Sequence, residues 1–192
     1  MTSQTIEPSD CIVLFADLQL GIVELTKTNP LDRLQIGVKG LAKLAKIFSL
    51  PVIVSAIAGE DGTPAAIIPQ IGEGFGSYSI HHRTTANSLL NEEILAVIKN
   101  SGRRTLLISG VATELAVQLP AVTSVDLGFQ AVLVMDACGG ISERTEQAAL
   151  NRARQCGATT TCVMTLAGEL AGDFRQASAQ AAIGVVFEMA AA

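Results

Sequence analysis

Continuous apolar and β-branched runs recur along this chain, and helical segments separate them. Five runs are clear and a sixth, at 77–82, is weaker; the clear ones span 11–16, 51–57, 105–110, 131–137 and 159–164. Unbroken apolar runs are typical of parallel strands buried on both faces. Apolar residues at helical spacing mark the intervening segments 31–48, 91–98 and 143–155. This alternation predicts right-handed βαβ units, and hence an α/β fold with a doubly wound parallel sheet.

The 192 residues are enough for one domain with a substantial core but not comfortably for two. No internal repeat or low-complexity linker divides the chain, so we expect a single domain over residues 1–192. The segment 59–79 is rich in Gly, Pro and Ile, and we expect a loop over the site or against a partner subunit. The tail from Ser178 ends in IGVVFEMAAA. Two interpretations stay open: a last helix or strand packed on its own subunit, or packing on a neighbour.

Composition excludes several classes of partner. A net charge of −5 without any dense Lys/Arg run argues against nucleic acid. No apolar run reaches the roughly 18 residues of a membrane span, and MTSQTIEPSD does not resemble a secretory signal. The four cysteines have neither CxxC spacing nor a nearby histidine pair, so we expect reduced cytoplasmic thiols: Cys11, Cys138, Cys156 and Cys162. A hydrophobic content of 49% favours a homo-oligomer.

Two charged residues follow predicted strands, where open α/β sheets bind ligands. Asp17 directly follows CIVLFA, and a partly desolvated carboxylate there suits proton transfer; its alternative role is to cap the turn DLQLG. Arg83 follows SYSIHH and could hold a carboxylate or an anionic intermediate, although an arginine at a strand end is more often a surface residue. His81 and His82 are adjacent, so on a strand they face opposite ways and do not suggest one metal site.

The turn DACGG follows another predicted strand. We expect Asp136 to cap the helix start at 142–143 or to brace a neighbouring loop. Cys138 lies at the edge where a nucleophile could act, but nothing basic accompanies it in sequence. We therefore expect a structural, buried thiol.

The stretch GVATELAV, 110–117, combines a strand end with a helix start. Gly110 allows a sharp exit, Thr113 is expected to be the N-cap, and the backbone N–H groups that follow could hold an oxyanion. Pro120 removes a helical hydrogen bond and opposes the carbonyl of Ala116. We therefore expect the helix to bend at residue 116.

GVATELAV resembles the GVxTxxCV signature of the isochorismatase-like cysteine hydrolases. Asp17, Arg83 and DACGG occur in the order that this family shows, and the resemblance extends over roughly residues 11–174. The arginine at 83, where many relatives have lysine, is typical of the YcaC-like branch, as are PAV after the signature and the segment LAGELAGDFR.

The resemblance implies a six-stranded parallel sheet in the order 3-2-1-4-5-6 with helices on both faces. It also implies hydrolysis of a small amide or related C–N substrate through a cysteine thiolate and an acyl-enzyme. Asp17 would be the acid/base and Arg83 the cation. The backbone N–H groups of Ala112 and Ala116 would form the oxyanion hole, next to a cis peptide bond between Val111 and Ala112.

The resemblance also bears on cofactors and assembly. It implies a large ring-like homo-oligomer. Relatives with a metal site carry histidines after the second strand, where this chain reads SAIAGEDGTP, so we expect no metal and no cofactor.

Ala116 departs from the family, because it occupies the position of the cysteine nucleophile. Three explanations stay open: an engineered Cys→Ala change, a natural pseudoenzyme that binds a ligand or serves in assembly, or an Asp-dependent vinyl-ether hydrolase of the isochorismatase type. The last is weakened because isochorismatases generally have lysine at the position of Arg83. The hydrolase interpretation predicts one pocket that holds Asp17, Arg83 and Ala116 and takes a small-molecule substrate.

Overall fold

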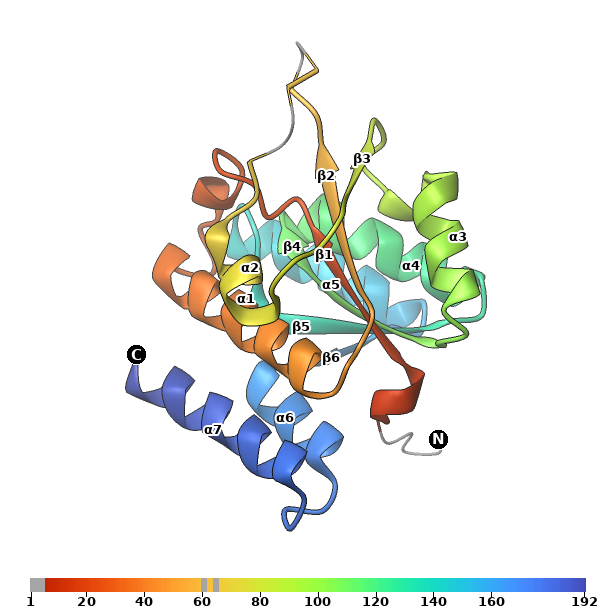
Figure 1. Cartoon of the computed structure of the whole chain (residues 1–192). Coiled ribbons are helices and arrows are strands. Elements are labelled where there is room, and N and C mark those ends of the chain that lie inside the picture. Colours follow the sequence, from red (N-terminus) through yellow and green to blue (C-terminus); the bar gives the residue numbers. More distant parts are fainter. Residues whose placement is uncertain (1–5, 60–61, 64–65) are drawn as a thin grey trace.

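The computed structural model describes residues 6–59, 62–63 and 66–192. Its centre is a six-stranded parallel sheet in the order β3-β2-β1-β4-β5-β6, which confirms the expected topology (Figure 1). The strands are β1 Cys11–Ala16, β2 Val52–Ile57, β3 Ile80–Arg83, β4 Thr105–Val111, β5 Gln130–Gly139 and β6 Thr159–Thr161. The strand order reverses between β1 and β4, so this is where a doubly wound sheet opens its binding edge.

In the described part of the chain, seven α-helices cover the two faces of the sheet: α1 Leu31–Ile47, α2 Pro69–Phe75, α3 Glu92–Asn100, α4 Gln118–Asp126, α5 Glu143–Gln155, α6 Val163–Ala171 and α7 Ala177–Ala191. Alternate residues of β1 divide the core between the faces. Val13 and Phe15 belong to the cluster under α1, α2, α6 and α7, whereas Ile12 and Leu14 belong to the cluster under α3, α4 and α5. Burial on both faces explains why this strand reads as one unbroken apolar run.

Three sequence expectations need correction. The segment 59–79 is not only loop, because it contains α2, a seven-residue helix that begins at Pro69 and packs on α1. The last strand ends at Thr161 rather than at residue 164, because Cys162 is the N-cap of α6 and accepts from the Thr165 N–H. The weaker strand starts later, at Ile80, and runs into Arg83.

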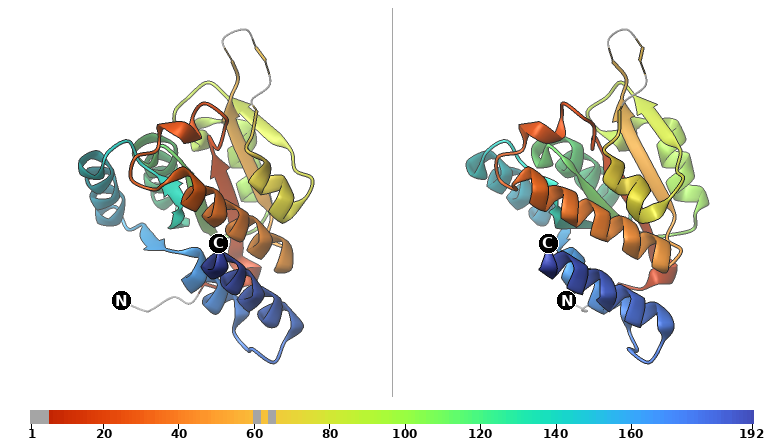
Figure 2. Two further views of the ribbon diagram at one scale, coloured as in Figure 1. Left: turned by 90° about the vertical axis from the view of Figure 1, so that its left-hand side faces the viewer. Right: turned by 60° about the vertical axis from the view of Figure 1, so that its left-hand side comes forward.

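The tail forms helix α7, which contacts α6 and α1 of its own chain. In all three views it lies outside α1, at the edge of the molecule (Figures 1 and 2). Among the described residues, no helix has the length and apolar character needed to cross a membrane.

The backbones of β1 and β4 approach closely at their carboxyl ends. Ala16 pairs with Gly110, and a Cβ on Gly110 would lie 2.3 Å from the Ala16 carbonyl oxygen. Glycine is therefore required here. Asp17, the first residue after β1, and Val111, the last residue of β4, directly follow this pair.

Candidate functional site

Asp17 and Arg83 form a buried ion pair across the end of β2. Asp17 follows β1 and Arg83 ends β3, so the arginine side chain passes over β2 to reach the carboxylate. Arg83 Nη2 lies 2.5 Å from Asp17 Oδ2, Nε donates to Ser55 Oγ at 2.9 Å, and Nη1 donates to the Thr85 carbonyl. Only 6% of Asp17 and 3% of Arg83 is exposed, so Arg83 is not the surface residue that its position alone favoured.

The environment of Asp17 is unusual for an aspartate. Burial raises the pKa of its carboxyl, and the Arg83 guanidinium opposes only part of that rise. Its backbone has φ +55°, in the left-handed region that costs free energy for residues other than glycine. Its Oδ1 atom is buried and has no hydrogen-bond partner among the described residues. One carboxylate oxygen is thus held by Arg83 while the other can still accept or carry a proton.

The stretch after β4 forms a wide helical turn, as a π-helix at Thr113–Val117 that continues as α4 from Gln118. The peptide bond between Val111 and Ala112 is cis, as the resemblance implied. The helical hydrogen-bond pattern changes between Val117 and Gln118, one residue beyond Ala116. The bend expected at residue 116 stays a prediction.

Thr113 does not cap this helix, which corrects the expectation from sequence. The N-cap is Ala112, and Thr113 Oγ1 instead donates to Glu146 Oε1 of α5 at 2.8 Å in a buried hydrogen bond. Glu114 accepts from the Ile141 N–H at 3.0 Å and from Thr145 Oγ1 at 2.6 Å. The turn is therefore fastened to α5 and to the loop before it.

Ala116 is 1% exposed and belongs to the apolar cluster that includes Ala16, Leu89 and Cys138. Its N–H donates to the Ala112 carbonyl at 2.9 Å. One of the two N–H groups expected in the oxyanion hole is thus already hydrogen-bonded within the turn. The methyl group of Ala116 offers no nucleophile.

Cys138 cannot replace that nucleophile. It is buried, its thiol donates to the Ile108 carbonyl at 3.7 Å, and burial raises its pKa to about 12. A thiol with this pKa has almost no thiolate at neutral pH. The expected structural role of Cys138 is therefore confirmed.

Of the two roles expected for Asp136, capping of the helix start at 142–143 is wrong, because Asp136 caps α6 instead. Both of its carboxylate oxygens accept from the Val163 N–H, at 2.9 and 3.1 Å, at the start of α6. The helix at 143 is capped by its own Ser142, which accepts from the Thr145 N–H.

The histidines show no metal-like arrangement. His81 Nδ1 pairs with Glu93 Oε1 at 3.1 Å, and His82 is exposed. In the described part of the chain, no group of three or more His, Cys, Asp or Glu side chains could hold a metal ion.

Three further buried polar residues were not predicted from the sequence. Ser55 orients Arg83, whereas Ser88 Oγ and Gln118 Nε2 are buried without a hydrogen-bond partner among the described residues. Ser55 and Gln118 each interrupt an apolar stretch, VIVSAI and LAVQLPA, and that interruption was the available signal.

A cavity of about 390 Å³ lies beside this edge of the sheet. It is lined by Gln19, Ile22, Ile57, Ala58, Gly59, Thr63 and Ala66. Gln19 closes one wall, because its amide pairs with both the N–H and the carbonyl of Ile57, each at 2.9 Å. Asp17, Arg83 and Ala116 are not among the lining residues, so the expected single pocket holding all three is not this cavity.

The fold and this site define a class of protein. The model of the isochorismatase domain matches residues 11–165, and the chain belongs to the isochorismatase family. Among curated proteins it is 32% identical over 171 residues to the probable hydrolase YcaC of Escherichia coli, covering 88% of this chain and 82% of that protein.

Solved structures agree with this assignment. YcaC from Pseudomonas aeruginosa, with hexane-2,5-diol and covalent acrylamide, aligns with a TM-score of 0.89 and 28% identity, covering 100% of this chain and 96% of that one. The E. coli YcaC structure, described as an octameric hydrolase of unknown specificity, aligns with a TM-score of 0.88 and 30% identity, covering 98% and 92%.

Proposed function

We propose that this chain is an isochorismatase-family hydrolase whose site is built for a small amide or related C–N substrate and which lacks the cysteine nucleophile. The buried pair of Asp17 and Arg83 carries this proposal, because isolating two charges from water is costly and needs a reason beyond stability. Asp17 would transfer protons through its free Oδ1. Arg83 would hold the carboxylate in place and stabilise negative charge on the substrate.

The chemistry that is missing can be stated atom by atom. With cysteine at 116, the Asp17 carboxylate would accept the thiol proton and the sulfur would attack the carbonyl carbon of the substrate. The leaving amine would take the proton back, and water would release the acyl group. Ala116 has neither the proton nor the lone pair, so we expect this chain to bind such a substrate without forming an acyl-enzyme.

Restoring the thiol tests the proposal. P. aeruginosa YcaC carries covalent acrylamide, and acrylamide is an electrophile that alkylates thiolates. We expect Ala116→Cys to be labelled by acrylamide at residue 116 well below pH 8, as read by peptide mass spectrometry. We also expect amide hydrolysis at least about 10³-fold above that of the alanine chain.

The matched control is the double variant Ala116→Cys with Asp17→Asn, which keeps the thiol and removes its base. It should be labelled slowly and should not turn over. A sluggish thiol and no hydrolysis in the single variant would instead support a non-catalytic binding or scaffold protein.

One observation favours a second function, acid-catalysed hydrolysis of a vinyl ether. Asp17 has a raised pKa and a free oxygen, which suit a general acid, and this route needs no thiol. The unmodified chain would then cleave isochorismate. Because the protonated form is the active one, the rate should fall as pH rises through the raised pKa of Asp17. Asp17→Asn should abolish the activity.

We also propose that the chain assembles with copies of itself and works in the cytoplasm. Self-assembly is supported by the octameric E. coli relative and by the apolar composition. The four free cysteines suit a reducing compartment.

A further inference from the structure

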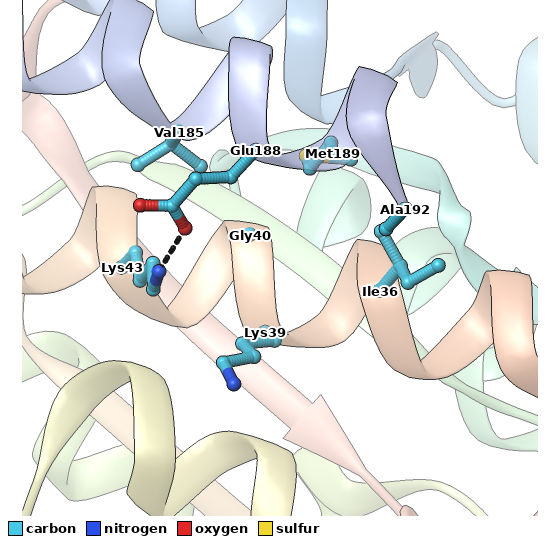
Figure 3. Close-up of a pocket in the computed structure, with 8 residues that line it drawn as sticks. All are labelled: Ile36, Lys39, Gly40, Lys43, Val185, Glu188, Met189 and Ala192. Carbon is cyan, nitrogen blue, oxygen red and sulfur yellow. Dashed lines mark hydrogen bonds and ion pairs between the residues drawn. The ribbon is translucent and has the colours of Figure 1, made fainter.

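Helix α7 uses one face to dock on its own chain. Ala179, Ala182 and Val185 form a buried stripe along this face. Figure 3 shows Val185 and Glu188 reaching toward α1, where Glu188 pairs with Lys43. Met189 packs closely on Gly40, because a Cβ there would lie 2.5 Å from the Met189 sulfur. The inner face of α7 therefore packs on its own chain, apart from a cavity of about 260 Å³ between α7 and α1.

The opposite face of α7 is partly exposed and mostly apolar, with Gln180 as its polar residue. Gln180, Ile183, Gly184 and Phe187 recur at intervals of three and four, so they share one side of the helix. Phe187 is 71% exposed, and the position of a Cβ on Gly184 has nothing within 4 Å. A helix that is apolar on both faces is normally enclosed by protein on both.

This outer face has one projecting side chain, Phe187, and one shallow cavity, the hollow into which a partner side chain could fit. Phe174, Gln180 and Ile183 line a shallow cavity of about 400 Å³. Phe187 projects one helical turn beyond Ile183. Two such faces placed antiparallel would bring each Phe187 to the hollow of the other copy, with Gly184 midway between them.

We propose that the outer face of α7 is the contact through which two copies of this chain pair, antiparallel about a two-fold axis at Gly184. Self-complementarity is what a two-fold interface requires, because each copy presents the same surface. The absence of a side chain at Gly184 lets the two helix backbones approach. The only charged residue of α7 is Glu188, which is already paired with Lys43, so the two faces do not repel each other.

This inference rests on the self-assembly proposed above and adds the surface through which two copies associate. Because another surface could also assemble the chain, the position of the axis needs its own test. A disulfide forms only when the two Cα atoms lie within about 4.4–6.8 Å, so a cysteine at a two-fold axis reports its own symmetry mate.

The first experiment is oxidation of Gly184→Cys in a background with Cys156→Ser and Cys162→Ser. We expect a disulfide-linked dimer on a non-reducing gel. The matched control is Asn151→Cys in the same background, which places a cysteine on an exposed position of α5 and should stay monomeric on the gel. Equal cross-linking of the two variants, or none for Gly184→Cys, overturns the proposed axis.

The second experiment measures mass in solution by light scattering. Phe187→Glu and Gly184→Gln should each reduce the mass of the assembly at least two-fold, whereas Leu127→Glu, at an exposed site after α4, should not. Circular dichroism checks that each variant is folded. If Phe187→Glu does not fold, the mass of Gly184→Gln decides the test. Variants that keep the mass of the wild-type assembly overturn this interface but not self-assembly; a monomeric wild type overturns both.

Discussion

At the scale of single residues, Arg83 joins three parts of the chain at one point. It reaches Asp17 after β1, Ser55 in β2 and the Thr85 carbonyl beyond β3. Replacing it with methionine would leave the buried Asp17 carboxylate without its cation. We expect Arg83→Met to lower the free energy of unfolding by about 3–5 kcal/mol at neutral pH, measured by urea denaturation.

The loss of stability in Arg83→Met should depend on pH, and its direction follows from the pKa of Asp17. Arg83 lowers the pKa of Asp17, so its removal lets burial raise that pKa further. When the pKa of a carboxyl is raised in the folded state, its contribution to the free energy of unfolding is present at low pH and is lost as pH rises through the native pKa. The difference between Arg83→Met and the wild type should therefore shrink as pH falls. A double variant with Asp17→Asn should be less destabilised than Arg83→Met alone, and a difference that grows toward acid would contradict this explanation.

At the scale of elements, the contact between α1 and β5 depends on Gly37. A Cβ at this position would lie 2.0 Å from the Asp136 carbonyl oxygen, which belongs to the strand backbone and cannot move freely. We expect Gly37→Ala to cost at least about 1–3 kcal/mol in urea denaturation. Gly168→Ala in α6 is the matched control, because its Cβ would meet nothing within 4 Å. It should be neutral or stabilising by up to about 1 kcal/mol; similar losses in both variants would contradict the steric explanation.

Elements were predictable where the pattern was long and local. The buried strands and the helices α1 and α5 have apolar spacing that sequence alone displays. Helix α2 was missed because it has only seven residues and two internal glycines, so its periodicity is too short to recognise.

The site was predictable only in part, for a related reason. Asp17 follows β1 and Arg83 ends β3, and the topology brings the carboxyl ends of these strands to one edge of the sheet. The partners of Thr113 and Asp136 are distant along the chain: Thr113 bonds Glu146, and Asp136 caps α6 at Val163. From the sequence, the nearest helix start was expected for each of them, with a neighbouring loop as the alternative for Asp136, because only the packed fold shows which helix lies nearest in space.

At the scale of the whole molecule, the proposed interface and the candidate site lie at different ends. Figure 1 shows α7 at the lower edge, whereas the carboxyl ends of β2 and β3 point to the top. Pairing through α7 would therefore leave the edge that holds Asp17 and Arg83 open to substrate.

Assembly should then stabilise the fold in a way that depends on protein concentration. Folded chains bind each other and unfolded chains do not, so mass action raises the midpoint of thermal unfolding as the concentration increases. We expect the wild-type midpoint to rise by a few degrees (on the order of 2–8 °C) over a hundredfold range in calorimetry. Phe187→Glu should flatten this dependence and Leu127→Glu should keep it. If the wild-type midpoint does not change with concentration, or if Phe187→Glu keeps the full slope, the coupling between α7 pairing and stability is wrong.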